Sequence, residues 1–430
     1  MRPAVPGLFA AACALLLALA AATPLPAQHP GTGGSRPRRE QAEPPPPDPY
    51  AGDDAEAKAR AGIVRYGPFP FADRHGTSKI EEVLGDVPIR WVETAHFKIG
   101  SALGPYRIPV TDKKQRARLR AELAELAEIL PGIDPKTQVI DPWLRLHLFV
   151  RRLEQQYADT CELLGVTDED FPSGPGQLVA GRYMGEGPYL GMPNKFAVLL
   201  LEKESDLGRY TLRFIGRQRQ TTTRHLFARD IESATLFLGV ATEAFDGFYS
   251  DDTRLYCHVA FNTAHNLLHG YKFFWYGLPC WVAEGFAHWY SRQISVENNN
   301  WSGIVETSPG LRNEWNWVPK IYARVKQDYY PSAAELCTIT DYQRLHFSDH
   351  MMIWSRIEYL LSQEDRARFA AFLDALEGRI EEAPPGTIPT AEMVLARQEE
   401  AFTRAYGMDW AEFDRRWRAW VLKEFKRRKR

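Results

Sequence analysis

The sequence lacks an excess of charge of either sign, since 53 Lys and Arg residues stand against 55 Asp and Glu residues. A formal net charge of −2 gives no field along the chain that attracts nucleic acid, which excludes that class of partner from our expectations. The sequence also lacks an internal repeat. With 44% hydrophobic and 25% charged residues, the chain has the composition of a globular protein with a substantial core.

An apolar run long enough to cross a bilayer is also missing, because the run at residues 8–22 is shorter than the about 20 residues that a spanning helix needs. The run follows Arg2 and ends in small residues, as an export signal does. Cleavage after Ala22 or after Ala27 fits equally well. We therefore predict a signal peptide over 1–27, a periplasmic or extracellular mature protein without a transmembrane span, and a disordered Pro-rich linker over 28–60.

Cysteine is scarce, and no Cys-x-x-Cys pair occurs, which argues against a zinc site built from thiolates. Removal of the signal leaves four cysteines: Cys161, Cys257, Cys280 and Cys337. An oxidising compartment would permit two disulfides among them, whereas buried free thiols are the alternative, and the sequence leaves both open. A bond between Cys257 and Cys280 is not expected, because they fall at opposite ends of two antiparallel helices.

The spacing of apolar residues predicts an α+β fold, with a sheet-containing N-terminal part over 61–250 and a mostly helical part over 251–430. The near-continuous apolar run at 195–203 is typical of a central strand, and 234–242 is a second candidate strand. Residues 143–166 carry the spacing of a long amphipathic helix, and most segments beyond 251 carry the same spacing.

Two of the predicted helices carry residues that can bind a metal. His265 and His269 are four residues apart and share a face of the first helix, while Glu284 and His288 share a face of the second. Aromatic residues surround Glu284, and a buried carboxylate needs a partner because burying it unpaired is costly. A metal held by His265, His269 and Glu284 would satisfy all three side chains, and zinc in catalytic sites prefers three protein ligands plus a water. Core histidines, with Glu284 paired to Arg292 or His288, remain the alternative.

The segment "LPCWVAEGFAHWYSR" resembles the Glu-Gly-x-Ala helix of peptidase-MA-like (gluzincin) zinc metallopeptidases found among exported bacterial proteins. In that group the helix follows a His-Glu-x-x-His motif, and the corresponding segment here is "HNLLH". The C-terminal "AFTRAYGMDWAEFDRRWRAWV" is also similar to the helices that accompany this domain. The resemblance implies zinc ligands at His265, His269 and Glu284. The sequence departs from the motif at Asn266, because those enzymes have a glutamate at that position.

Asn266 removes the proton carrier of such an enzyme. The glutamate accepts a proton from the zinc-bound water and passes it to the leaving amine, whereas an asparagine amide can hold a water but cannot accept its proton. Losing a general base costs on the order of 10²–10⁴ in rate. His288 is the candidate for a substitute base, a fourth ligand or a residue that supports the ligands. His258 is expected to lie too far along its helix to touch the metal.

We therefore expect a catalytically impaired metallopeptidase-like protein that binds a peptide or an envelope partner. An active zinc hydrolase with an unusual base is the first alternative. The second is a metal-free structural or carbohydrate-binding envelope protein, suggested by the aromatic and amide residues of 298–301 and 313–317. His346 and His350, also four apart, are interpreted as structural because no partner acid is recognisable. The sequence does not indicate the oligomeric state.

Overall fold

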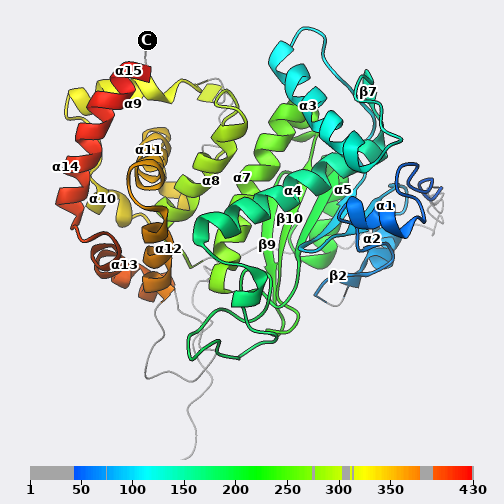
Figure 1. The fold of residues 1–430 in the computed structure, drawn as a ribbon, viewed down its shortest axis with the longest axis horizontal. Helices are drawn as coiled ribbons and strands as arrows, with labels where there is room; N and C mark the ends of the chain where they lie inside the picture. The colour runs from blue at the N-terminus through cyan, green and yellow to red at the C-terminus, as the bar shows by residue number, and fades with distance from the viewer. Residues whose placement is uncertain are drawn as a thin grey trace, which may run out of the picture. The chain divides into compact units, whose positions relative to one another are not determined.

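The computed structural model describes residues 43–73, 75–273, 277–302, 310–311, 314–377 and 391–428. Residues 40–430 form one compact unit, so the two parts expected on either side of residue 250 are packed as one body. The α+β class is confirmed, because a mixed sheet occupies the first part and helices dominate the second (Figure 1). The predicted signal peptide and residues 28–42 of the linker lie outside the described residues. Within the described part, no helix is both long and apolar enough to cross a membrane.

The prediction of a disordered linker is wrong for residues 43–60, which pack onto the body of the protein. The Pro46 carbonyl accepts a hydrogen bond from the Trp143 indole at 2.8 Å. Asp48 is buried, and its carboxylate accepts from the Tyr66 hydroxyl at 2.6 Å and contacts the His147 ring at 2.9 Å. Composition predicted disorder because the segment has few apolar residues, but long-range contacts with the Pro46 carbonyl and the Asp48 carboxylate hold it in place.

A six-stranded mixed sheet forms the centre of the fold, in the order β1-β4-β5-β8-β10-β9. The strands β5, β8 and β10 are parallel neighbours, whereas β1, β4 and β9 pair antiparallel to theirs. The bounds of the strands in this sheet are β1 (Arg65–Tyr66), β4 (Arg90–Glu93), β5 (Phe97–Ser101), β8 (Phe196–Leu201), β9 (Thr223–Phe227) and β10 (Thr235–Ala241). Two small sheets pair β2 (Pro70–Ala72) with β3 (His75–Gly76) and β6 (Tyr106–Arg107) with β7 (Val139–Ile140).

Both faces of the sheet are covered, which explains why its central strands are apolar throughout. On β8, Leu199 packs in the cluster formed with α2 (Thr77–Leu84) and α5 (Glu204–Phe214). The next residue, Leu200, belongs to the cluster on the opposite face, where α4 (Pro142–Leu164) and α7 (Asp252–Gly270) lie. The predicted strands at 195–203 and 234–242 and the helix at 143–166 are thus confirmed as β8, β10 and α4.

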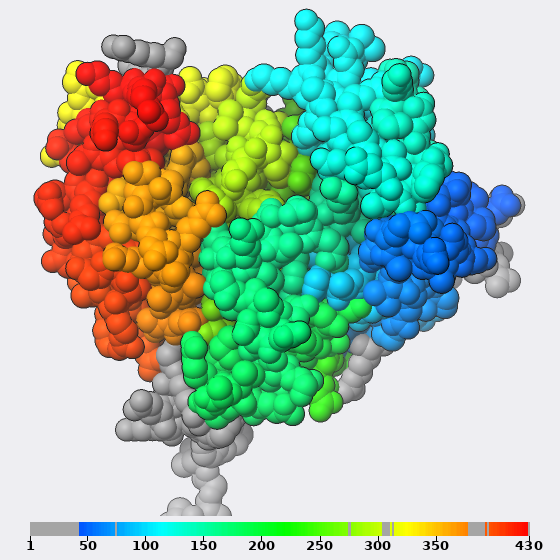
Figure 2. All heavy atoms as spheres, in the orientation of Figure 1, coloured from blue at the N-terminus to red at the C-terminus, as the bar shows by residue number. Residues whose placement is uncertain are grey.

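The remaining helices have the following bounds: α1 (Ala55–Arg60), α3 (Lys113–Ile129), α6 (Ala244–Gly247), α8 (Cys280–Ile294), α9 (Trp317–Lys326), α10 (Ala333–Cys337), α11 (Phe347–Gln363), α12 (Arg366–Glu377), α13 (Ala391–Tyr406), α14 (Trp410–Trp420) and α15 (Lys426–Arg428). The helical half joins the sheet half through α7, which packs against β10 and α4, and through α12, which packs against α4. On the face shown in Figure 2, the orange surface of α12 borders the green surface of α4 and the residues that follow it.

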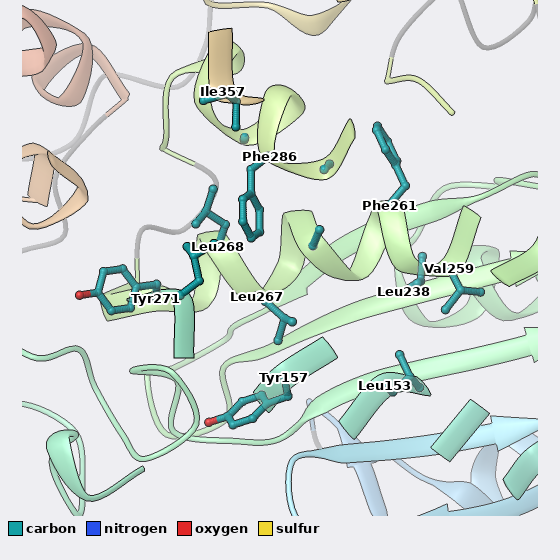
Figure 3. Close-up of a cluster of buried hydrophobic side chains, with 14 of the residues drawn as sticks. Leu153, Tyr157, Leu238, Val259, Phe261, Leu267, Leu268, Tyr271, Phe286 and Ile357 are labelled. Atoms are coloured by element: carbon teal, nitrogen blue, oxygen red, sulfur yellow. The ribbon is translucent and has the colours of Figure 1, made fainter. Parts of the chain in front are cut away.

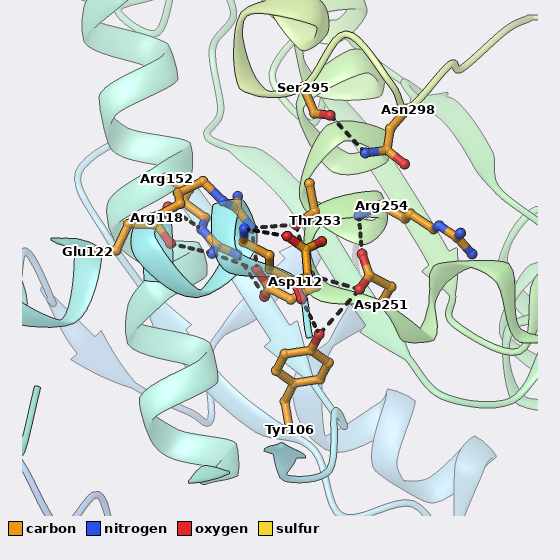
Figure 4. A network of polar contacts seen from close by, with 12 residues as sticks. Tyr106, Asp112, Arg118, Glu122, Arg152, Asp251, Thr253, Arg254, Ser295 and Asn298 are labelled. Carbon is orange, nitrogen blue, oxygen red and sulfur yellow. Dashed lines mark hydrogen bonds and ion pairs between the residues drawn. The ribbon is translucent and has the colours of Figure 1, made fainter. Parts of the chain in front are cut away.

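The start of α7 is fixed by a buried ion-pair network. The Asp251 carboxylate caps the helix by accepting from the Arg254 backbone N–H at 3.0 Å. Asp252 is fully buried and accepts from Arg152 of α4 and Arg118 of α3, both at 2.9 Å. Figure 4 shows these arginines reaching the helix start from the neighbouring helices. Because unpaired buried charges are costly, this network holds α7 at one position along the sheet.

The Asp252 network predicts a contribution to acid unfolding. Burial alone would raise the pKa of the Asp252 carboxyl, but the positive charges of Arg152 and Arg118 outweigh it and hold the pKa at about 2. Because this lies below the about 3.9 of an unfolded Asp, the stabilisation is complete above that value and is lost as the pH falls toward about 2. The free energy of unfolding, measured with urea, should therefore be higher for the wild type than for Asp252→Asn. This difference should shrink by about 1 kcal/mol between about pH 5 and about pH 3.

As a control, Glu56→Gln changes a carboxylate whose side chain is 89% exposed, and its stability difference from the wild type should hardly depend on pH. An equal advantage over Asp252→Asn at both pH values would contradict the role of the network.

Candidate metal centre

Helices α7 and α8 run antiparallel and carry the candidate site between them. Phe261 of α7 lies against His288 of α8, with ring centroids 5.1 Å apart, and one turn further along α7 His265 meets Glu284. The helix α7 uses its other side to cover the sheet, where Figure 3 shows Leu267 and Val259 pointing away from α8. Buried apolar contacts on both sides therefore hold the facing polar residues in place.

Glu284 is the central residue of the site. Its side chain is fully buried, and its two carboxylate oxygens have different partners. The oxygen Oε2 lies 3.0 Å from His265 Nε2. The oxygen Oε1 accepts from the Ser302 backbone N–H at 2.9 Å and lies 3.1 Å from His350 Nδ1. Glu284 thus joins α7, the start of α11 and the segment around Ser302.

A second helix contact brings His350 to this carboxylate. Gly285 lies where α11 crosses α8, and a Cβ atom at this position would come within 2.5 Å of Ile357 and 2.7 Å of Ile353. The absence of a side chain therefore allows α11 to approach α8 closely. As a result His350, in the first turn of α11, reaches the buried centre.

The side chains of Glu284, His288 and His350 bring three possible metal-ligand atoms close together. The ligand atoms of Glu284, His288 and His350 all lie within 4.8 Å of one another, and all three side chains are buried. His288 Nε2 is 3.1 Å from His350 Nδ1 and 3.6 Å from Glu284 Oε1. The single proton that His350 Nδ1 can carry cannot point at both neighbours at once. The three side chains have the ligand atoms and the spacing to hold a metal ion.

The protonation states of these side chains suit a metal. Burial and the neighbouring Arg224 charge lower the pKa of His265 to about 4, although the Glu284 hydrogen bond opposes this shift. Burial likewise places the pKa of His288 well below its usual value. For Glu284, burial would raise the pKa, but hydrogen bonds from His265 and His350 keep it well below the usual range. Neutral imidazoles beside an ionised carboxylate are the forms that ligate metals.

The residues that the sequence singled out are not all equally close to Glu284. His265 touches it, as described above, whereas His269 lies one turn further along α7, with its ring nearly parallel to that of His265 and the centroids 6.1 Å apart. His258, expected to lie too far away, contacts Thr222 and Asn300 and stacks on Tyr249. The structure thus brings Glu284 together with His288 and His350, and His265 contacts the other carboxylate oxygen. Among the described residues, the predicted set of His265, His269 and Glu284 does not form a group with all three ligand atoms within 4.8 Å.

Asn266 is directed at the sheet. Its side-chain amide donates to the Phe237 carbonyl of β10 at 3.2 Å, and the residue is buried. The amide thereby ties α7 to the sheet, a role that the comparison with His-Glu-x-x-His did not suggest. A packing role therefore explains why asparagine occupies position 266.

The tryptophans of the two aromatic segments divide between the interior and the surface. Trp301 and Trp317 are 3% and 0% exposed, and their rings lie 6.1 and 5.1 Å from His288. They enclose the metal-ligand group and offer no stacking face for sugars, whereas Trp315 is 40% exposed. Of the tryptophans in these segments, Trp315 alone is left to support the carbohydrate-binding alternative. Cys161, Cys257, Cys280 and Cys337 are all free thiols.

Comparison of the chain with protein-family models, with curated proteins and with solved structures finds no match. The proposed function therefore rests on the geometry of the site and on the resemblance of its motifs.

Two residues of the site escaped the sequence analysis. The sequence favoured a structural role for His350 because no partner acid was recognisable, yet the fold brings it to Glu284 from 66 positions away, as the residue numbers show. One feature of the sequence could have indicated this role. His350 lies on the buried, Met- and Ile-rich face of α11, and a buried histidine needs a polar partner. Ser302 contributes through its backbone N–H, which no side-chain pattern reveals.

A variant of His350 tests whether this residue belongs to the metal centre. His350→Ala should weaken zinc affinity at least about tenfold, because the residue either ligates the ion or orients the Glu284 carboxylate. The affinity is measured by competition with a chromophoric chelator at neutral pH. His269→Ala, measured in parallel, reports on the ligand set that the sequence resemblance implies.

His346→Ala is the matched control, since His346 is exposed and stands four residues before His350 at the start of the same helix. If His350→Ala binds zinc as tightly as His346→Ala does, His350 has no part in the metal centre.

Proposed function

We propose that the chain is an exported, metallopeptidase-like protein that holds zinc at Glu284 and binds a peptide or an envelope partner without cutting it. The observation that carries the proposal is the hydrogen bond from the Asn266 amide to the Phe237 carbonyl, beside the buried centre of Glu284 and its histidines. The position that supplies the base in the enzymes that the sequence resembles serves here to attach α7 to β10. The resemblance and this contact together favour binding over hydrolysis.

The Glu284 carboxylate and the histidines on both sides of it are suitable zinc ligands, because zinc in proteins is ordinarily bound by imidazole nitrogens and carboxylate oxygens. The resemblance assigns His265 and His269 as the remaining ligands, and His288 and His350 would then orient the carboxylate through Oε1. When bound, such an ion would act as a Lewis acid and lower the pKa of a bound water.

A substitute base is poorly supported. His288, the candidate from the sequence, is buried and faces Glu284 and His350, enclosed by the rings of Phe261, Trp301 and Trp317. A general base must come within hydrogen-bond reach of the proton it abstracts, directly or through one water. The ligand-capable side chains are themselves 0–1% exposed, which favours an ion that stabilises the junction of α7, α8 and α11.

The metal-free alternative has an observation of its own in its favour. Glu284 is within hydrogen-bond distance of His265 Nε2, His350 Nδ1 and the Ser302 N–H, which can satisfy a buried carboxylate without an ion. The metal content of the protein therefore decides between a zinc centre and a structural network.

The proposal is tested on the mature protein, purified without chelators and then reconstituted with zinc. Metal analysis should give close to one zinc per chain. Incubation with a library of peptides, followed by mass spectrometry, should recover bound peptides of unchanged mass. Peptide fragments that disappear on addition of a chelator would establish an active hydrolase, and a protein that binds neither zinc nor peptide would support the structural alternative.

Replacing Asn266 by the residue of the active enzymes should destabilise the fold. Asn266→Glu removes the donor to the Phe237 carbonyl and buries a carboxylate near that oxygen, which costs about 1–3 kcal/mol or more. Urea unfolding near neutral pH measures the loss. Gln293→Glu makes a similar change from amide to carboxylate at an exposed position of α8 and should change stability by less than about 0.5 kcal/mol. Equal effects of the two substitutions would show that the contact with β10 is not important.

A further inference from the structure

A cavity of about 530 Å³ lies at the edge of the sheet, beside the candidate metal centre. It is formed by β9, which is the last strand in the order of the sheet, by the chain that leads into β9, by Asn262 of α7 and by Trp301 and Ser302. Three arginines line it: Arg217, Arg219 and Arg224. We call it the arginine cavity. Its volume falls within the range of about 300–1,000 Å³ that is typical of ligand sites.

The positive charge of the arginine cavity is not balanced by its own walls. No Asp or Glu occurs among the described residues that line it. Neither Arg217 nor Arg219 forms an ion pair with any residue in the described part of the chain. Three guanidinium groups gathered without a carboxylate repel one another, so an anionic ligand that enters the cavity gains attraction from all three.

Arg224 is the most constrained of the three. Its Nη2 donates to the Ser302 hydroxyl at 2.8 Å, while Nη1 is buried without a hydrogen-bond partner among the described residues. The neighbouring Thr223 is 9% exposed, and its hydroxyl also lacks such a partner. Buried polar groups normally have partners, so these unused groups at the wall of a cavity indicate a ligand that supplies them. A carboxylate, which accepts two parallel hydrogen bonds, matches a guanidinium group.

One residue connects the arginine cavity to the metal centre. Ser302 receives the hydrogen bond from Arg224 through its hydroxyl and donates to Glu284 through its backbone N–H at 2.9 Å. A ligand in the cavity therefore lies one residue away from the central carboxylate of the site.

We infer that the arginine cavity binds acidic side chains of a peptide, with Arg224 as the residue that selects carboxylates. The inference rests on the proposed function for the peptide nature of the ligand, and it adds that the peptide is acidic. Anionic polysaccharide is less favoured, because the Trp301 ring at the cavity is 3% exposed and gives no broad face on which a sugar could stack.

The test measures binding of a fluorescently labelled Glu-rich peptide and of its Gln-for-Glu counterpart by anisotropy at physiological salt. The zinc-reconstituted full mature protein should bind the Glu-rich peptide roughly 10- to 100-fold more tightly, because hydrogen bonds to charged groups discriminate by this amount. Arg224→Gln should abolish most of the preference. Arg213→Gln is the control, since Arg213 is an exposed residue of α5 outside the cavity wall, and it should leave the preference intact.

A second variant guards against a folding defect in Arg224→Gln. Arg217→Gln combined with Arg219→Gln alters two exposed side chains, and it should reduce the preference for the Glu-rich peptide without changing the circular dichroism spectrum. Equal binding of the two peptides by the wild type overturns the inference, and so does a preference that survives in both arginine variants.

Competition identifies the source of the anion. Inorganic phosphate and a polyuronate oligomer should each displace the Glu-rich peptide only weakly. Displacement of the peptide by phosphate at equal concentration would show a small-anion site. Stronger displacement by the polyuronate would show a polysaccharide site. Either result overturns the peptide assignment.

The failure of this inference is distinguishable from the failure of the proposed function. A protein that contains zinc and leaves peptides intact but shows no preference for acidic peptides refutes the inference alone. A protein that prefers acidic peptides but binds no zinc refutes the metal part of the proposed function and leaves the cavity assignment standing.

Discussion

The buried carboxylate of Glu284 is the constraint on which the rest of the site depends. A carboxylate removed from water requires several hydrogen-bond donors or a cation, and no single helix supplies them. The fold meets the requirement by bringing together His265 from α7, His350 from α11 and the backbone of Ser302. Each of these contacts depends on a packing feature elsewhere, such as the close approach of α11 permitted by Gly285.

The position of α7 follows from a second set of buried polar contacts. The arginines around Asp252 fix the beginning of the helix, and the Asn266 amide fixes its middle against β10. Because α7 cannot slide, His265 stays opposite Glu284. The attachment to β10 gives Asn266 a structural role even though it cannot act as a base.

The sequence predicted the parts of the fold that depend on local periodicity. The apolar runs of β8 and β10 and the amphipathic spacing of α4 and α7 identified those elements, because burial on one or both faces determines which residues they contain. The order of residues 43–60 was missed, since it rests on hydrogen bonds from Trp143, Tyr66 and His147 that are distant in sequence.

The candidate site was predictable to a similar extent. The pairing of the two motif helices followed from their spacing and placed His265 beside Glu284. His350 and Ser302 were not predictable, because tertiary packing alone brings them to the carboxylate. The Asn266 side chain points toward the sheet because of the way α7 is rotated about its own axis. Hydrophobic periodicity defines that rotation only to within the width of the apolar face.

The most direct test of this account is anomalous diffraction at the zinc absorption edge, from crystals of the mature protein reconstituted with zinc. The account predicts a peak about 2.0–2.2 Å from an oxygen of Glu284, with at least two imidazole nitrogens at about the same distance. Such a map would also show whether His265 and His269 or His288 and His350 complete the ligand set. A map without a peak at Glu284, with the carboxylate instead hydrogen-bonded to His265, His350 and Ser302, would contradict it.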